Sequence, residues 1–205
     1  MTQQRAVFLD RDGVVNVDHG YVHKIEQFRF IAGSDIAMAR LQAAGWRLVV
    51  VTNQSGLARG LYSIDDYERF TAHLRQQLTA VGVRLDAVLH CPHLPDATVG
   101  TYRLACNCRK PGPGMLLQAA RELSLDMGAS VIVGDRLSDV LAGRAAGVRH
   151  CVLVKSGVAL EPGDEQRADA VYDNLAAFTD AWLSRDPHSA SLPRDGAPID
   201  PAARG

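Results

Sequence analysis

The chain has 205 residues, of which 47% are apolar and 22% are charged. These proportions are typical of a soluble globular domain, and they exclude a disordered chain and a coiled coil. The 22 Lys and Arg residues nearly balance the 23 Asp and Glu residues, and the net charge is −1. Because nucleic-acid-binding domains carry a basic field, we expect no nucleic-acid partner.

The chain carries no sign of export or of membrane insertion. No apolar stretch approaches the roughly 18 residues of a membrane span, and the first five residues lead at once into a strand-like run. Four cysteines without a secretory signal indicate reduced thiols that serve packing or metal binding. We therefore expect a cytoplasmic protein without a membrane partner, and a monomer.

Five short runs of β-branched and other apolar residues alternate with helical patterns along the chain. The runs cover residues 6–9, 47–51, 85–89, 131–133 and 151–154. Runs that are apolar at nearly every position are typical of strands covered on both faces, as in a parallel sheet. With helices between them, they predict a doubly wound, mainly parallel α/β sheet.

Capping residues and helical spacing predict four helices between these strands. Ser34 is expected to cap the first, and Ser63 with Asp66 approximates a capping box for the second. Apolar residues at helical spacing predict the other two over residues 115–123 and 138–146.

The pattern of strands and helices ends at Ser184. The remaining segment holds four of the nine prolines, with only Leu192 and Ile199 as large aliphatic residues. Such a segment buries too little apolar surface to offset the entropy lost on ordering. We expect one domain over residues 1–183, followed by a disordered tail over residues 184–205.

Polar residues follow three of the expected strands at the point where each strand ends. Asp10 and Asp12 follow the first strand, Thr52 follows the second, and Asp135 follows the fourth with Asp139 four residues later. Ligands of a parallel α/β sheet bind beyond the carboxyl ends of its strands. Gathered carboxylates need a compensating cation, and oxygen ligands favour Mg²⁺. The pattern predicts a magnesium site that can bridge to a phosphate.

A phosphate held there would meet groups suited to phosphoryl transfer. Asp10 would be the nucleophile that forms an aspartyl phosphate, and Asp12 the general acid and base. Lys110, with Arg109 beside it, precedes a helix and supplies positive charge, while Thr52 adds a further donor. A single Asp-x-Asp-Gly or Arg-Lys pair is often only a solvated turn, but their combination favours a catalytic site.

The long loop after the third expected strand concentrates metal-binding side chains. Cys91 and His93 form one short hook, and Cys106 and Cys108 form a second. Three thiols and one imidazole are the ligand set of a closed, structural zinc site. Such a zinc would fold the loop within residues 90–110 and position the two basic residues that follow it directly. The fourth cysteine lies in an expected strand and is interpreted as a core residue.

Four segments, FLDRDG, VVVTN, CRKPGPG and VGDRLSD, together resemble the motifs of the haloacid dehalogenase superfamily. The resemblance implies Asp10 as nucleophile and Asp12 as acid/base, with Thr52 and Lys110 as phosphoryl clamps. It also implies that Mg²⁺ is held by Asp10, by the backbone carbonyl of Asp12 and by Asp135.

From about residue 6 to 183 the chain is similar to the zinc-loop group of this superfamily and, within it, to the heptose 1,7-bisphosphate 7-phosphatases. That similarity implies a small sugar bisphosphate as substrate and no large cap domain. It implies substrate contacts from Asp18, His19, Gly20, Tyr21, Asn53, Gln54, Ser55, Arg109 and Arg136. Arg136 and Gly112 stand where Lys and His are expected, which could change affinity without changing the reaction.

Three alternatives differ in what they require. A histidinol-phosphate phosphatase would share the fold, the zinc loop and the catalytic set. A DNA 3′-phosphatase should show a basic groove or a kinase partner, and the near-zero net charge argues against this alternative. A non-catalytic, zinc-organised binding module would be favoured by loss of Asp10 or Asp12, and both are present.

Overall fold

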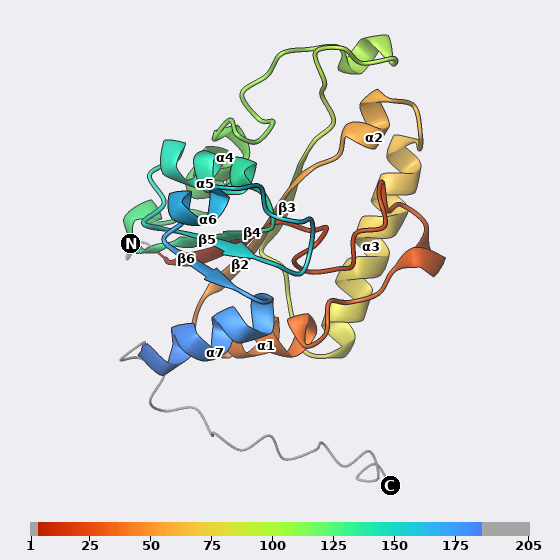
Figure 1. Ribbon diagram of the computed structural model, residues 1–205. Helices are drawn as coiled ribbons and strands as arrows, with labels where there is room; N and C mark the ends of the chain where they lie inside the picture. Colours follow the sequence, from red (N-terminus) through yellow and green to blue (C-terminus); the bar gives the residue numbers. More distant parts are fainter. Residues whose placement is uncertain (1–3, 186–205) are drawn as a thin grey trace, which may run out of the picture.

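A computed structural model describes residues 4–185 of the chain (Figure 1). Six strands form one sheet in the order β3-β2-β1-β4-β5-β6, and all neighbouring strands are parallel. The strands are β1 (Ala6–Leu9), β2 (Arg47–Asn53), β3 (Ala87–Cys91), β4 (Val131–Gly134), β5 (His150–Val154) and β6 (Ala170–Tyr172).

Helices cover both faces of the sheet (Figure 1). One face packs against α1 (Ser34–Ala43), α3 (Ile64–Ala80) and α7 (Leu175–Arg185), and the other against α4 (Gly114–Leu123) and α5 (Leu137–Ala145). Two one-turn helices, α2 (Ser55–Ala58) and α6 (Asp164–Arg167), lie in connections. The expected doubly wound α/β fold is confirmed.

Strand β1 shows why continuous apolar runs suit this position. Val7 and Leu9 pack into the core beneath α1, α3 and α7, whereas Ala6 and Phe8 pack beneath α4 and α5. All four residues are fully buried, because alternate side chains of a strand point to opposite faces and both faces are covered.

The sequence missed two elements at the edge of the fold. Strand β6 pairs with β5 alone, and its three half-buried residues, Ala170–Tyr172, form an apolar run too short to indicate a strand. Helix α7 was not expected either, although its residues Phe178 and Leu183 enter the core. The third strand begins two residues later than expected, because Asp86 is used instead to accept a hydrogen bond from the Leu48 amide at 2.9 Å.

The two expected helix caps have different outcomes. The capping box before α3 is confirmed: Ser63 Oγ accepts from the Asp66 amide at 3.1 Å, and Asp66 Oδ2 accepts from the Ser63 amide at 2.8 Å. The cap assigned to Ser34 is wrong, because Gly33 is the N-cap residue of α1. The buried Ser34 hydroxyl instead donates to the Val15 carbonyl at 2.7 Å, a tertiary contact that ties α1 to the loop after β1.

The connections after β1 and β3 leave the carboxyl edge of the sheet open. In the described residues, the segments from β1 to α1 and from β3 to α4 contain only the short 3-10 turns Ile25–Gln27 and Gly100–Tyr102, and no large cap domain is present. Over residues 4–185 no helix combines the length and apolarity needed to cross a membrane. Helix α7 runs to Arg185, and the rest of the expected tail lies outside the described residues.

Candidate active site and metal centres

A pocket of about 430 Å³ lies beyond the carboxyl ends of β1 and β2, where the sequence places its candidate residues. Most of those candidates line it, and so do Tyr62 and Ser138, which the sequence did not suggest. The lining residues are Asp10, Asp12, Asp18, Gly20, Tyr21, Thr52, Asn53, Gln54, Ser55, Tyr62, Arg109, Lys110, Arg136 and Ser138. The candidate His19 is exposed and does not line the pocket.

A buried ammonium group forms part of the pocket floor. Lys110 Nζ lies 3.0 Å from Asp10 Oδ1 and 2.5 Å from Asp139 Oδ1, and it donates to the Val51 carbonyl at 2.8 Å. Burial alone would lower the pKa of Lys110, but the two carboxylates raise it above its ordinary value. For Asp10 the balance is reversed, since burial raises its pKa although Lys110 opposes the shift.

Three carboxylates gather beside this lysine. Oxygens of Asp10, Asp135 and Asp139 all lie within 4.8 Å of one another, and all three residues are buried. Burial and then the charge of Asp139 raise the pKa of Asp135 to about 6. One oxygen of Asp135 accepts from the Val158 amide at 3.1 Å, whereas Oδ1 is buried without a hydrogen-bond partner. An excess of buried carboxylate oxygens with an unsatisfied member fits a hard divalent cation such as Mg²⁺.

The backbone approaches Asp135 closely from two sides. A Cβ atom added at Gly157 would lie 2.0 Å from Asp135 Oδ2, and one added at Gly13 would lie 2.5 Å from it. Gly13 also has a φ of +82°, which side chains rarely allow. The Ser156 hydroxyl donates to the Gly13 carbonyl at 2.7 Å. The loop after β5 and the turn after β1 therefore enclose this carboxylate together.

Asp12 stands outside the carboxylate cluster and has its own partners. Its oxygens accept from Arg11 Nε at 3.1 Å and Nη2 at 2.9 Å, from Asn16 Nδ2 at 2.9 Å and from Gln54 Nε2 at 3.2 Å. Arg11 was not among the functional residues predicted from the sequence. Its only signal was a cation placed between the two aspartates of the Asp-Arg-Asp-Gly segment.

Two of the expected substrate-binding side chains also hold the floor of the pocket together. Asn53 pairs with the backbone of Lys110 in both directions, donating to its carbonyl and accepting from its amide at 3.0 Å each. Gln54 donates to the hydroxyl of Thr52 at 2.7 Å. The contacts of Asn53 join the end of β2 to Lys110.

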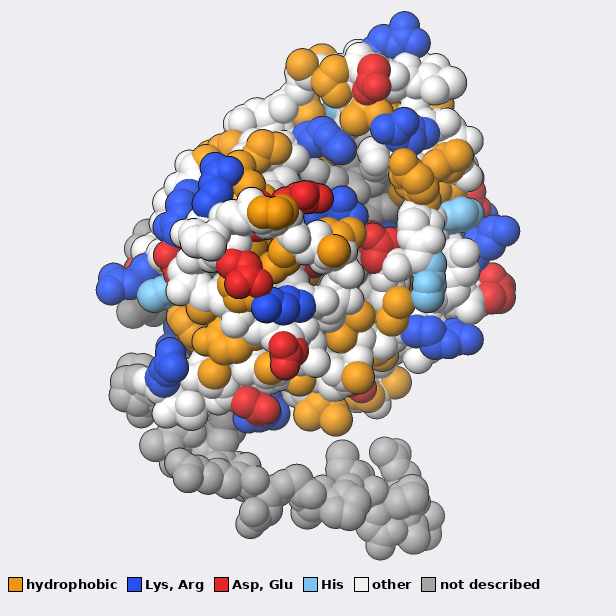
Figure 2. Space-filling view, in the orientation of Figure 1, with side chains coloured by type: hydrophobic (Ala, Val, Ile, Leu, Met, Phe, Trp, Pro, Cys, Tyr) orange, Lys and Arg blue, Asp and Glu red, His pale blue; other side chains and the backbone are white. Residues whose placement is uncertain are grey.

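Charged side chains of both signs form the mouth of the pocket. Arg136 lies 3.5 Å from Asp18, and Arg109 donates to the His93 carbonyl at 3.4 Å. Tyr21 is 45% exposed and adopts a φ of +54°. The face shown in Figure 2 likewise carries interspersed basic and acidic side chains rather than one broad charged area.

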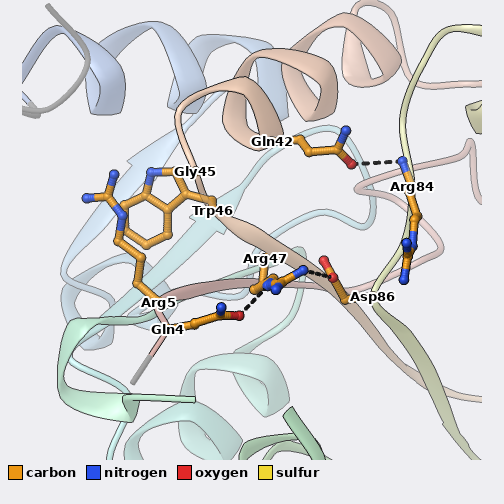
Figure 3. Close-up of a pocket in the computed structure, with 8 residues that line it drawn as sticks. All are labelled: Gln4, Arg5, Gln42, Gly45, Trp46, Arg47, Arg84 and Asp86. Carbon is orange, nitrogen blue, oxygen red and sulfur yellow. Dashed lines mark hydrogen bonds and ion pairs between the residues drawn. The ribbon is translucent and has the colours of Figure 1, made fainter. Parts of the chain in front are cut away.

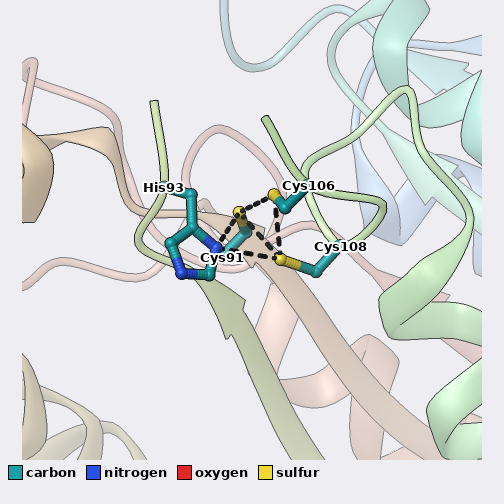
Figure 4. Close-up of side chains that lie close together, drawn as sticks. All are labelled: Cys91, His93, Cys106 and Cys108. Atoms are coloured by element: carbon teal, nitrogen blue, oxygen red, sulfur yellow. Dashed lines mark hydrogen bonds between the residues drawn. The ribbon is translucent and has the colours of Figure 1, made fainter. Parts of the chain in front are cut away.

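The four expected zinc ligands converge at one point (Figure 4). Cys108 Sγ lies 3.2 Å from the sulfurs of Cys91 and Cys106 and 3.3 Å from Nδ1 of His93. Zinc–sulfur bonds of about 2.3 Å would place tetrahedral sulfurs roughly 3.8 Å apart, so the cluster needs only a small expansion to hold zinc. Although Cys106 is partly buried, its hydrogen bonds with Cys108 and the Arg109 backbone lower its pKa to about 7.

The segment after the last cysteine follows a tight path. The Gly112 amide donates to the Arg109 carbonyl at 2.6 Å, and the Gly114 amide donates to the Asn107 carbonyl at 2.8 Å. A Cβ atom at Gly112 would lie 2.4 Å from the Asn107 carbonyl oxygen. The glycine noted as a departure from the family pattern is therefore required by the local backbone of this chain.

A second pocket, of about 530 Å³, lies at the amino-terminal edge of the sheet (Figure 3). Arg5 lies over the Trp46 ring at 4.2 Å, and Arg47 pairs with Asp86 at 2.7 Å. None of the candidate residues lines this pocket.

Comparison with known proteins agrees with this geometry. A family model described as HAD-hydrolase-like matches residues 107–178. The D-glycero-beta-D-manno-heptose-1,7-bisphosphate 7-phosphatase of Photorhabdus laumondii is 48% identical over 171 residues, which are 83% of this chain and 91% of that protein. The Escherichia coli K12 protein of the same name is 48% identical over 176 residues, covering 86% and 92%.

A solved structure extends the similarity to the fold. D,D-heptose 1,7-bisphosphate phosphatase from B. bronchiseptica, complexed with magnesium and phosphate, is 34% identical with a TM-score of 0.74, covering 89% of this chain and 100% of that one. The fold and the site therefore define a phosphatase, and the chain belongs to the haloacid dehalogenase-like hydrolases. The relatives that establish this membership share one name, that of the heptose bisphosphate 7-phosphatases.

Proposed function

We propose that this phosphatase removes the C7 phosphate from D-glycero-D-manno-heptose 1,7-bisphosphate in the biosynthesis of nucleotide-activated heptose for lipopolysaccharide. The observation that carries the proposal is the buried pair of Asp10 and Lys110, 3.0 Å apart, beside an incompletely neutralised carboxylate cluster at an open pocket. A pocket of about 430 Å³ suits a small sugar phosphate. The shared name of relatives that match over four-fifths of the chain supports the choice of sugar.

In the first step, a carboxylate oxygen of Asp10 attacks phosphorus and the bond from phosphorus to the leaving oxygen breaks. The Arg11 amide and Lys110 Nζ both engage Oδ1 of Asp10, at 2.7 Å and 3.0 Å, which leaves Oδ2 for the attack. Asp12, which lines the pocket, gives its proton to the leaving oxygen of the sugar. Lys110 and Thr52 hold the phosphoryl oxygens.

In the second step, Asp12 takes a proton from water, and the water oxygen attacks the phosphorus of the aspartyl phosphate. The bond between phosphorus and Asp10 breaks, inorganic phosphate leaves, and the Asp10 carboxylate is restored.

Two metals belong to this proposal. The carboxylates of Asp10 and Asp135, with the Asp12 carbonyl, would hold Mg²⁺, which neutralises charge on the phosphoryl group. The three thiols and the imidazole of the zinc loop would hold a structural Zn²⁺. The monomeric state and the cytoplasmic location expected from the sequence stay predictions.

Arg109 is our candidate for the second phosphate of the substrate. It lines the pocket next to the clamp lysine. Its hydrogen bond to the His93 carbonyl is long, 3.4 Å, and therefore weak, so a charge-assisted bond to phosphate can replace it. A guanidinium group can hold a phosphate through two parallel hydrogen bonds. The proposal therefore has the C1 phosphate retained at Arg109 while the C7 phosphate reacts at Asp10.

The test is phosphate release from both anomers of the heptose bisphosphate, from histidinol phosphate and from a 3′-phosphorylated oligonucleotide, each with Mg²⁺. We expect the highest kcat/KM with a heptose bisphosphate and no turnover by Asp10→Asn. A higher kcat/KM with histidinol phosphate would instead assign the chain to histidine biosynthesis. If Asp10→Asn retained a tenth of the wild-type turnover, the aspartyl-phosphate mechanism would be wrong.

A further inference from the structure

The side chain between the two catalytic aspartates is a buried cation. Arg11 is 1% exposed and is the largest of the fully buried side chains in the described residues. Its guanidinium lies over the Phe70 ring at 4.7 Å. Burying a guanidinium is costly unless its donors are satisfied, and removing its partner would leave the charge uncompensated. The contacts of Arg11 should therefore show what it does in the fold.

Most of those contacts are to the acid/base residue. Two nitrogens of Arg11, Nε and Nη2, face both oxygens of Asp12 at 2.9 to 3.2 Å. The same Nη2 donates to the Val22 carbonyl at 2.8 Å, which anchors the guanidinium to the segment after β1. A planar fork that meets a carboxylate through two nitrogens restricts its rotation more than a single hydrogen bond does. Protein donors thus hold the Asp12 carboxylate on one side, and its other side faces the pocket.

A glutamine links this arrangement to the phosphoryl clamp. Gln54 Oε1 accepts from Arg11 Nη2 at 3.2 Å and from the Tyr62 hydroxyl at 2.6 Å. Its amide nitrogen donates to Asp12 at 3.2 Å and to Thr52 at 2.7 Å. Burial raises the pKa of Tyr62, so its hydroxyl keeps the proton that it donates. Asp12, in the turn after β1, and the hydroxyl of Thr52 in β2 are therefore held in one hydrogen-bond network.

We propose that Arg11 is a positioning residue for proton transfer: its guanidinium fixes the Asp12 carboxyl group in the orientation from which it protonates the leaving oxygen. The inference rests on the role proposed for Asp12. Arg11 itself keeps its proton at all working pH values, so it acts only through Asp12. We therefore expect loss of Arg11 to slow the reaction most when the leaving oxygen most needs a proton.

Two aryl phosphates of nearly the same shape separate this role from a general structural one. Phenolate is a poor leaving group that needs protonation, whereas p-nitrophenolate leaves without it. Because kcat/KM covers the steps through departure of the leaving group, later hydrolysis of the aspartyl phosphate does not affect the comparison. A positioning role therefore changes the ratio of the two kcat/KM values, while a collapsed site lowers both values equally.

The experiment measures kcat/KM for phenyl phosphate and p-nitrophenyl phosphate with wild type, Asp12→Asn, Arg11→Lys and Arg11→Met. Arg11→Lys keeps the charge but loses the fork, and we expect it to lose about tenfold on phenyl phosphate and less than about threefold on p-nitrophenyl phosphate. Arg11→Met, whose side chain can still pack near Phe70, should show a larger change in the same direction. Arg47→Lys is the matched control, because Arg47 also pairs with a carboxylate but lies at the opposite edge of the sheet (Figure 3).

The outcomes distinguish this inference from the proposed function. If Asp12→Asn lowers both rates equally, the acid role of Asp12 is wrong. If Asp12→Asn is selective for the poor leaving group but both Arg11 variants lower the two rates equally, Arg11 only supports the fold and the inference is overturned. Circular dichroism and melting temperature check that each variant is folded. If Arg11→Lys does not fold, the comparison is made with Arg11→Met.

Discussion

The close approach of Gly157 to Asp135 makes a single added methyl group a sharp test of the carboxylate cluster. In Gly157→Ala the new Cβ would lie 2.0 Å from Asp135 Oδ2, whereas ordinary contacts begin at 3.4 Å, so one of the two must move by about 1.4 Å. Mg²⁺ requires nearly ideal ligand positions, and a misplacement of about 1 Å in an active site can cost roughly 100-fold in rate. We expect the Kd for Mg²⁺ to rise at least about tenfold and kcat to fall about 100-fold.

Calorimetric titration of the metal-free protein with Mg²⁺ measures the first effect without relying on activity, and phosphate release measures the second. Gly100→Ala is the matched control, because a Cβ atom there meets nothing within 4 Å. Its Mg²⁺ affinity and kcat should equal those of the wild type. Wild-type Mg²⁺ affinity in a folded Gly157→Ala protein would refute the assignment of Asp135 as a ligand held by the loop after β5.

Three further predictions test the metals and the substrate. Cys106→Ser should lower the zinc content below one per chain, and it should raise KM for the bisphosphate more than it lowers kcat. Elemental analysis measures the zinc content, and purified wild type without zinc would contradict the zinc assignment. In metal-free protein, the raised pKa of Asp135, about 6 against an ordinary 3.8, means that folding takes up a proton between these pH values, so stability falls as pH rises through them. The free energy of unfolding of Asp135→Asn should therefore exceed that of the wild type at pH 7 by up to about 3 kcal/mol, and the difference should disappear below about pH 4. Melting temperatures measured at pH 7 with a chelator check this. Equal values for the two proteins would show that the ionised Asp135 carboxylate does not destabilise the fold. Arg109→Ala should reduce kcat/KM for the heptose bisphosphate more than for a monophosphate, and equal losses would place the second phosphate elsewhere.

The central strands could be predicted because burial on both faces leaves a direct mark on the sequence. Every residue of β1 and β4 is apolar or glycine and fully buried. The edge strand β6 leaves a weaker mark, because it has only three residues, their side chains are half-buried and one neighbouring strand pairs with it. The Ser34 cap failed for a related reason. A capping rule considers only the local chain, whereas this hydroxyl bonds to Val15, 19 residues earlier.

The site shows the same division between local and tertiary information. Strand ends and motif spacing were enough to bring Asp10, Thr52 and Lys110 to one pocket. They did not show that Arg11 would be buried, because a charged residue in a turn is usually solvated. Nor did they separate Asp12 from the carboxylate cluster, since that depends on where its buried partners lie.

Two adjacent residues of the pocket, Arg109 and Lys110, are held by different parts of the fold. Lys110 is fastened to the central sheet, through both backbone bonds to Asn53 and through the Val51 carbonyl. Arg109, one position earlier, contacts the His93 carbonyl in the zinc loop. If these two residues act as proposed, the boundary between the reacting centre and the recognition surface falls at a single peptide bond. We would then expect a replaced or reshaped loop over residues 90–110 to change which molecules are selected while the sheet keeps the phosphoryl-transfer residues in place.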